Sequence, residues 1–252
     1  MKAKPNVYLL DVEGTVAPLS LVTEQLFPYA RAHFELFFKK NAGDAGIRSD
    51  LMLLAEENRA ETAPGVPRMP KIERPEDVES PRFRLDAMVY LVWLMDRDRK
   101  STALKSLQGK IWKIGFENGK LKGTLFADVP KAFQRWAHTG KVAIYSSGSV
   151  EAQQLLFRYS SEGDLTSLIS AYFDTRTGVK SESASYAAIA ARLGVSPDAV
   201  LFFSDAVREL DAARAAGCAT RLVVREGNVP VEDAHGHQSV TRLAAVEGEP
   251  AQ

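Results

Sequence analysis

Two carboxylates, Asp11 and Glu13, stand directly after the apolar run Val7–Leu10 and are followed by Gly14. The run is typical of a buried strand that ends in a loop. Alternate residues of a strand point to opposite faces, so Asp11 and Glu13 should leave the strand on the same side. Two converging carboxylates repel each other unless a cation lies between them. The pair therefore indicates a cation site, although a solvated acidic turn is the simpler interpretation of this segment alone.

Hydroxyl groups follow a second apolar run. Ser146, Ser147 and Ser149 surround Gly148 directly after residues 142–145, and a helix is expected to begin at once. The N-terminus of a helix offers free N–H groups and a positive dipole end, which suits phosphate. Ser149 is expected to cap that helix, which leaves Ser146 and Ser147 available to bind a phosphate group.

A lysine and a second acidic pair complete the set. Lys180 follows the turn at Gly178, and Asp205 and Glu209 follow the wholly apolar run 200–203. If a helix begins near residue 206, Asp205 and Glu209 lie one turn apart and face the same way. A carboxylate at the end of an apolar strand is costly unless it is paired or binds a metal.

These groups match the needs of phosphoryl transfer through an aspartyl-phosphate. A phosphate of about −2 beside Asp11, Asp205 and Glu209 gives a total near −5, against roughly +3 from Mg²⁺ and Lys180. The excess is smaller if Glu13 is protonated, which is also what a general acid for the leaving oxygen requires.

The surrounding elements would bring these residues to one edge of a parallel sheet. Strands alternate with helices, which predicts an α/β fold with helices on both faces of the sheet. The region between the first two strands reads as helix, with a proline-rich joint, and predicts a cap inserted into the core. The expected strands are 6–12, 142–147, 171–174, 200–205 and 221–224. The expected helices are 149–158, 183–193 and 207–216 in the core and 24–40, 48–59 and 81–99 in the cap, and the joint is Pro64, Pro67, Pro70 and Pro75. The segment beyond Asn228 is polar and is expected to be loosely ordered.

Bulk properties exclude several classes of protein. The chain has 252 residues, of which 45% are hydrophobic, and 32 basic residues balance 32 acidic ones. This balance argues against a nucleic-acid partner. No apolar run approaches the ~18 residues of a membrane span. The lone Cys218 is expected to be a small buried filler. With no signal peptide in view, a cytoplasmic protein is expected.

The sequence resembles the haloacid dehalogenase superfamily and, within it, the enolase-phosphatases of methionine salvage. Most members of the superfamily carry Asp-x-Asp in the first motif, whereas this subgroup carries Asp-x-Glu-Gly-Thr. The likeness covers nearly the whole chain. It is carried by Asp11–Thr15, Leu26–Ala30, Leu107–Trp112, Tyr145–Val150, Tyr172–Thr175, Ala184–Tyr186, Phe203–Asp205 and Glu209–Ala213. Val16-Ala17 and Val179 depart from the family pattern, without removing a functional group.

The resemblance implies a Rossmann-like core at 1–18 and 128–252 and a helical cap at 19–127. It also implies Mg²⁺, one ion per subunit, and a monomer that acts on a small phosphate ester. The activity implied is that of an acireductone synthase, which enolises and then dephosphorylates 5-methylthio-2,3-dioxopentyl phosphate. The cap residues that select the methylthio group stay open, with Phe27, Tyr29, Trp112 and Phe116 as candidates.

Residue by residue, the resemblance makes Asp11 the nucleophile and a metal ligand. It makes Glu13 the acid/base, with its backbone carbonyl on the metal. Ser146 and Ser147 would bind phosphate, Lys180 would bind phosphate and the nucleophile, and Asp205 would be a further Mg²⁺ ligand. Glu209 would support the site.

Three alternatives remain at this level. One is another capped phosphatase with a different small substrate. A second is a phosphorylation-dependent receiver, which also combines acids, a hydroxyl, a lysine and Mg²⁺ but has no ~100-residue insertion after its first strand. A third is a non-catalytic binding module on a degenerate phosphatase fold, against which the intact set of chemical residues argues.

Overall fold

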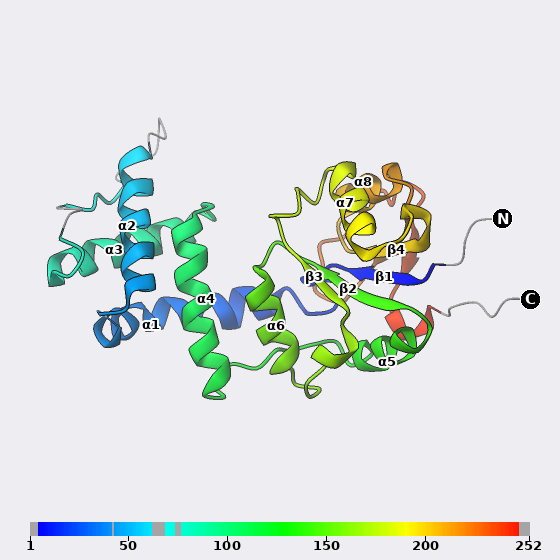
Figure 1. Ribbon diagram of the computed structural model, residues 1–252, viewed down its shortest axis with the longest axis horizontal. Coiled ribbons are helices and arrows are strands. Elements are labelled where there is room, and N and C mark those ends of the chain that lie inside the picture. The colour runs from blue at the N-terminus through cyan, green and yellow to red at the C-terminus, as the bar shows by residue number, and fades with distance from the viewer. Residues whose placement is uncertain (1–4, 42, 62–68, 74–76, 247–252) are drawn as a thin grey trace, which may run out of the picture. The chain divides into compact units, whose positions relative to one another are not determined.

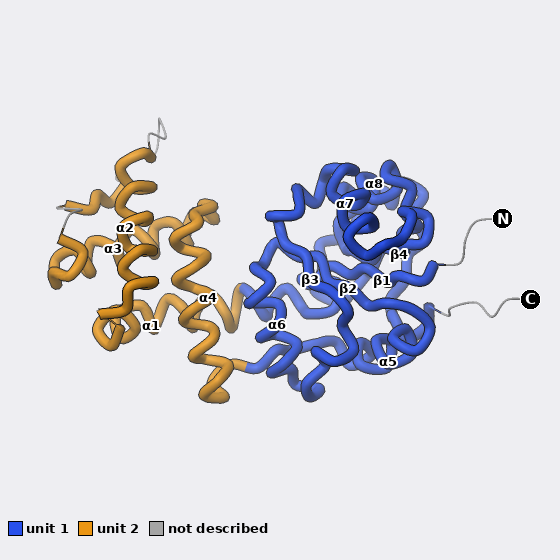
Figure 2. The backbone as a smooth tube through the Cα atoms, in the orientation of Figure 1, with its two compact units in different colours: residues 1–22, 122–252 blue, residues 23–121 orange. Residues whose placement is uncertain are grey.

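The computed structural model describes residues 5–41, 43–61, 69–73 and 77–246. The chain divides into two compact units, one made of residues 1–22 and 122–252 and the other of residues 23–121 (Figure 2). Pro64, Pro67 and Pro75 of the expected proline-rich joint lie outside the described residues. No helix in the described ranges is long and apolar enough to cross a membrane.

The first unit is built on a six-stranded, wholly parallel sheet in the order β3-β2-β1-β4-β5-β6. Its strands are β1 (Val7–Leu10), β2 (Lys141–Tyr145), β3 (Ala171–Phe173), β4 (Val200–Ser204), β5 (Ala219–Val223) and β6 (Gln238–Val240). Its helices are α5 (Val129–Thr139), α6 (Val150–Arg158), α7 (Ser183–Leu193) and α8 (Val207–Ala215). The α/β fold with a parallel sheet is therefore confirmed.

Helices cover both faces of this sheet (Figure 1). On one face, Phe202 of β4 packs with Tyr186 of α7, with ring centroids 5.0 Å apart. On the other face, Phe203 of β4 packs with Trp136 of α5 at 5.1 Å. Adjacent residues of one strand thus enter two different cores, which explains why β4 is apolar without alternation.

In the second unit, which we call the helical unit, the regular structure of the described residues is wholly helical. A π-helical segment (Leu21–Leu26) leads into α1 (Phe27–Lys40), followed by α2 (Ala45–Ala60), α3 (Pro81–Asp96) and α4 (Thr102–Glu117). Capping explains where α2, α3 and α4 begin: Asp44, Ser80 and Ser101 each accept a hydrogen bond from the backbone N–H three residues on, at 2.8–3.0 Å. The sequence pattern did not predict α4, although its residues Leu107–Trp112 carried part of the family resemblance.

The segment after Asn228 corrects an expectation. It contains β6, whose Gln238–Val240 pair with Arg221–Val223 of β5. Loose ordering is therefore wrong for the described residues up to 246, because a strand of only three residues leaves almost no alternating pattern to read. The helix α5 was also missed.

Candidate active site

The register of the sheet aligns the predicted chemical residues at its carboxyl edge. Leu10 of β1 lies opposite Ile144 of β2 and Phe203 of β4, so the residues that follow these strands are neighbours. Asp11 is therefore flanked by the loop that begins at Ser146 on one side and by the loop that begins at Asp205 on the other.

Lys180 joins two of the predicted acids. Its Nζ lies 2.5 Å from Asp11 Oδ1 and 2.7 Å from Glu209 Oε2. The side chains are largely buried, with 12% of Lys180 and 5% of Asp11 exposed. The hydroxyl of Ser204 also donates to Glu209 Oε2, at 2.9 Å. A residue that follows β1 and a residue in the first turn of α8 thus converge on one ammonium group.

The charges of this cluster depend on one another. Burial would lower the pKa of Lys180, but Asp11 and Glu209 more than offset this, so the pKa lies above its ordinary value. Burial and the negative charge of Asp11 raise the pKa of Glu209. The lysine therefore stays charged, and the site holds more negative charge than one lysine neutralises.

Glu13 lies where a general acid would be useful. The Ser146 hydroxyl donates to Glu13 Oε2 at 3.2 Å, and the same oxygen of Ser146 accepts the N–H of Gly148 at 3.0 Å. Burial, followed by the charge of Asp11, raises the pKa of the Glu13 carboxyl. Ser147 is exposed at the same strand end. Ser149 caps α6 by accepting the N–H of Ala152 at 3.2 Å, as predicted.

Asp205 approaches the turn that follows Glu13. Gly14 has a φ of +73°, and a Cβ built there would lie 2.2 Å from Asp205 Oδ2, so both conformation and space require glycine. Burial, with Asp11 and Glu209 adding to it, raises the pKa of Asp205 to about 7. Asp205 thus lies within the electrostatic field of the other acids, beside the turn that follows Asp11 and Glu13.

Three hydroxyls that were not predicted as site residues hold the loop of Lys180. Tyr145, Ser185 and Tyr186 donate to the carbonyls of Gly178, Val179 and Lys180 at 2.9, 2.7 and 2.7 Å. Three successive carbonyls are thereby fixed, which positions the lysine. Their sequence signal was the family resemblance, because Tyr145 and Ala184–Tyr186 lie in its matching segments.

The residues at this edge fit a hard divalent cation. Asp11 and Asp205 supply carboxylate oxygens, and the raised pKa values of Glu13, Asp205 and Glu209 all have Asp11 as a cause, which indicates negative charge that a cation would offset. Among the described residues, no group of three or more His, Cys, Asp or Glu side chains could hold a metal alone. A site here would combine two carboxylates with backbone, phosphate and water oxygens, as Mg²⁺ prefers.

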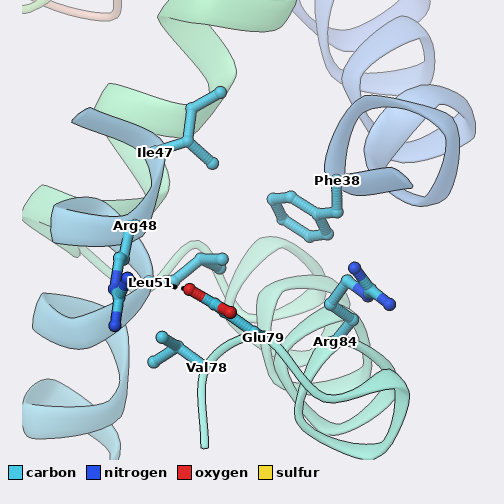
Figure 3. A pocket seen from close by; sticks show the side chains of 7 residues that line it. All are labelled: Phe38, Ile47, Arg48, Leu51, Val78, Glu79 and Arg84. Carbon is cyan, nitrogen blue, oxygen red and sulfur yellow. Dashed lines mark hydrogen bonds and ion pairs between the residues drawn. The ribbon is translucent and has the colours of Figure 1, made fainter. Parts of the chain in front are cut away.

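Two cavities differ greatly in size. The one in Figure 3 lies in the helical unit between Phe38, Ile47, Leu51 and Val78, beside the ion pair of Arg48 and Glu79; its volume of about 10 Å³ is that of a single water. The other, of about 380 Å³, lies beside Asp205 in the unit of residues 1–22 and 122–252, which we call the catalytic unit. Its other lining residues include Arg225, Asn228, Val229, Val231 and Ala234. Only the larger cavity has the volume of a small-molecule site.

Comparisons with known proteins agree with this geometry. The sequence-family model of the haloacid dehalogenase-like hydrolases matches residues 5–217 of this chain. The chain is 52% identical over 225 residues to the enolase-phosphatase E1 of Synechococcus elongatus, covering 89% of this chain and 90% of that protein. It is 44% identical to the enolase-phosphatase E1 of Leptospira borgpetersenii, covering 94% and 96%.

Among solved structures, the UTR4 protein of Saccharomyces cerevisiae superposes with a TM-score of 0.75 at 34% identity, over 96% of this chain and all of that one. A phosphate-bound CbbY of Rhodobacter sphaeroides shares the fold at 15% identity, with a TM-score of 0.56 and coverage of 96% of each chain. The receiver and the binding-module alternatives are therefore set aside. The chain belongs to the haloacid dehalogenase-like hydrolases and, within them, to the enolase-phosphatase E1 group.

Proposed function

We propose that this protein is a Mg²⁺-dependent acireductone synthase that converts 5-methylthio-2,3-dioxopentyl phosphate to 1,2-dihydroxy-5-methylthiopent-1-en-3-one and inorganic phosphate. The relatives named enolase-phosphatase E1 support the substrate class. The observation that carries the mechanism is the Lys180 ammonium 2.5 Å from Asp11 and 2.7 Å from Glu209. It places a fixed positive charge beside a buried carboxylate, where a phosphate group would otherwise be repelled.

In the proposed phosphoryl transfer, Asp11 attacks phosphorus and the bond from phosphorus to the ester oxygen breaks. Glu13 gives its proton to the leaving oxygen, for which its raised pKa suits it. Water then attacks phosphorus, its proton returns to Glu13, and Asp11 is released together with inorganic phosphate. Each step conserves atoms and needs no external oxidant or reductant.

Other side chains of the site bind the phosphate before transfer. Ser146 and Ser147 donate hydrogen bonds to its oxygens, and Lys180 offsets its charge. Asp11, Asp205 and the carbonyl of Glu13 would hold Mg²⁺, which when bound supplies positive charge for the phosphate and the enolate.

Enolisation precedes transfer and is an isomerisation. A proton leaves the carbon that bears the phosphate ester, and the neighbouring carbonyl oxygen gains one. The negative charge that develops on that oxygen is stabilised by a nearby cation, and Lys180 is the charged side chain available in the cluster.

We infer that the helical insertion, predicted at 19–127, selects the methylthio tail. In the helical unit of residues 23–121, Phe116 is 2% exposed and belongs to the interior, so it is no longer a strong candidate. Trp112 is half-buried, stacks with Phe27 at 6.4 Å and donates to the carbonyl of Leu26 at 2.8 Å. Phe27 and Tyr29 are also half-buried, so these two residues and Trp112 remain candidates.

Turnover of the synthetic diketone phosphate tests the proposal directly. Purified protein with Mg²⁺ should produce the ultraviolet absorbance of the acireductone and one phosphate for each substrate consumed. Excess chelator should abolish both signals, and added Mg²⁺ should restore them. Full activity in excess chelator would rule out the metal assignment, and absence of turnover with Mg²⁺ would rule out the substrate.

A further inference from the structure

The segment that follows β5 contacts the catalytic turn through two side chains. Arg225 Nε donates to the carbonyl of Thr15 at 3.2 Å, and Asn228 Nδ2 donates to the carbonyl of Gly14 at 2.9 Å. These two carbonyls are consecutive and belong to the turn directly after Glu13. One short segment therefore holds the backbone that carries the proposed acid.

The turn cannot satisfy these carbonyls by itself. The carbonyl of Val12 accepts the N–H groups of Thr15, Val16 and Ala17 at 3.2, 3.0 and 2.9 Å, which closes the turn from its inner side. Thr15 is fully buried, so its carbonyl has no access to water. A buried carbonyl needs a donor, and the two side chains supply one each for Gly14 and Thr15.

Arg225 is itself held on several sides. Its Nη1 lies 3.0 Å from Asp128 Oδ1 and donates to the carbonyl of Thr241 at 2.9 Å. Its guanidinium carbon lies 4.3 Å from the centre of the Phe126 ring. Asp128 Oδ2 in turn accepts the N–H of Leu243 at 2.6 Å. The donor on Thr15 is therefore presented by a rigid group rather than by a flexible surface arginine.

Stability alone is a weak explanation for this arrangement. The side chains of Arg225 and Asp128 are each only 6% exposed. Removing two such charges from water opposes most of the gain from pairing them, so a buried ion pair contributes little net stability. The fixed geometry that the pair imposes is its clearer consequence.

We propose that Arg225 and Asn228 are positioning residues that fix the Gly14–Thr15 turn and thereby hold the Glu13 carboxyl in place against Ser146. The inference rests on the proposed function, because it assigns the acid/base role to Glu13. Both side chains also line the cavity beside Asp205, but the role proposed for each acts through a backbone carbonyl of the turn. Their loss should slow the chemical step while leaving phosphate binding by Ser146, Ser147 and Lys180 intact.

Arg225→Lys and Asn228→Ala are the test variants. Lysine keeps the positive charge opposite Asp128 but cannot also present the Nε donor to Thr15. With an aryl phosphate and Mg²⁺, each variant should lose about tenfold in kcat, as expected when one positioning hydrogen bond is removed, with KM within about twofold. The thermal midpoint, measured in parallel, should stay within a few degrees of the wild-type value.

Two matched controls remove similar bonds elsewhere. Arg135 donates to the carbonyls of Ala244 and Val246 at 3.0 and 2.6 Å, away from the turn, so Arg135→Lys should keep wild-type kcat. Asn41 Nδ2 donates to the carbonyl of Phe37 at 2.8 Å in the helical unit, so Asn41→Ala should do the same. Equal losses of kcat in a test variant and its control would overturn the proposal.

Combination with Glu13→Gln separates positioning from general destabilisation. If Arg225 acts through Glu13, then Arg225→Lys should lower kcat by less than twofold in the Glu13→Gln background. A full tenfold loss in that background, or wild-type kcat in both folded test variants, would contradict the proposal. Full kcat in Glu13→Gln alone would count against the proposed role of Glu13, whereas the positioning role of Arg225 and Asn228 is judged by Arg225→Lys and Asn228→Ala.

Discussion

Among the described residues, the ion pairs in which both side chains are largely buried lie in the catalytic unit. In the catalytic unit, charged side chains are buried together: Lys180 is 12% exposed beside Asp11 at 5%. In the helical unit, the pair of Arg31 and Asp96 is exposed at 49% and 46%. Exposed pairs are solvated and contribute little, whereas buried charges shift one another's pKa values and create a field. The comparison locates the chemistry in the catalytic unit and predicts where substitutions matter.

The largest effect is expected at Asp11. Asp11→Asn keeps the size of the side chain but removes the proposed nucleophile, so phosphate release should fall by roughly four orders of magnitude or more, the scale of lost nucleophiles. Enolisation needs no nucleophile, and the phosphorylated enol should accumulate in single-turnover mixtures followed by ultraviolet absorbance. Release of phosphate at a near wild-type rate would remove Asp11 from this role.

Lys180→Ala should have the next largest effect. The change leaves Asp11 and Glu209 buried without their shared cation, and it removes charge stabilisation common to phosphate and enolate. Both half-reactions should slow by roughly 10²–10³-fold, on the scale of one lost oxyanion donor. Separate rates for enol formation and phosphate release would check this, and a loss confined to one of them would contradict the shared role.

A smaller effect is expected where a hydroxyl only supports the lysine loop. Tyr186 donates to the carbonyl of Lys180 at 2.7 Å, so Tyr186→Phe removes one buried hydrogen bond. The free energy of unfolding should fall by about 1–2 kcal/mol, and kcat should fall less than in Lys180→Ala. Urea unfolding and aryl phosphate kinetics measure the two effects, and a kcat as low as that of Lys180→Ala would show that Tyr186 does more than support the loop.

Exposed pairs of the helical unit provide the contrast. Arg48 Nη1 lies 2.8 Å from Glu79 Oε1, and both side chains are more than half exposed. Arg48→Ala should change the free energy of unfolding by no more than about 0.5 kcal/mol and leave kcat unchanged. A loss comparable to that of Tyr186→Phe would break the distinction between the two units.

The smallest effect concerns pH. A hydrogen bond from the exposed His235 to Asp211, 2.6 Å long, raises the pKa of the histidine, with the charge of Asp211 as the second cause. A raised folded-state pKa means that the stabilisation is complete below the unfolded value of about 6.5 and is lost as pH rises through the folded value. The difference in thermal midpoint between wild type and His235→Gln should therefore be larger at pH 5.5 than at pH 8. An equal difference at both pH values would show that the ion pair contributes nothing.

Much of the fold could be predicted because its signals are local. Each signal lies within a few residues. The run Val200–Phe203 is apolar because β4 is buried on both faces, Ser149 caps α6, and Gly14 adopts a positive φ. The element α7 was predicted at 183–193 and is observed at Ser183–Leu193. The short strand β6 was missed because three residues form a strand only through pairing with β5.

The residues of the site also fall into those that could be predicted from the sequence and those that could not. Asp11, Glu13 and Asp205 could be named in advance because a charged residue just after a buried strand is a local anomaly, and the order of the motifs along the chain indicated Lys180. The groups that hold them in place were not visible. Arg225 and Asn228 lie more than 200 residues from the turn that they contact, and only the folded sheet brings β5 beside β4 and so near β1.

The central claim is a covalent phosphoryl group on Asp11, and one measurement addresses it directly. Wild-type enzyme is mixed with the diketone phosphate and Mg²⁺, quenched in acid within the first turnover, digested and examined by mass spectrometry. The account predicts a phosphoryl group on the peptide that contains Asp11, absent when Asp11→Asn is treated in the same way. Phosphate released in that turnover with no phosphorylated peptide, or with the phosphoryl group on another residue, would contradict it.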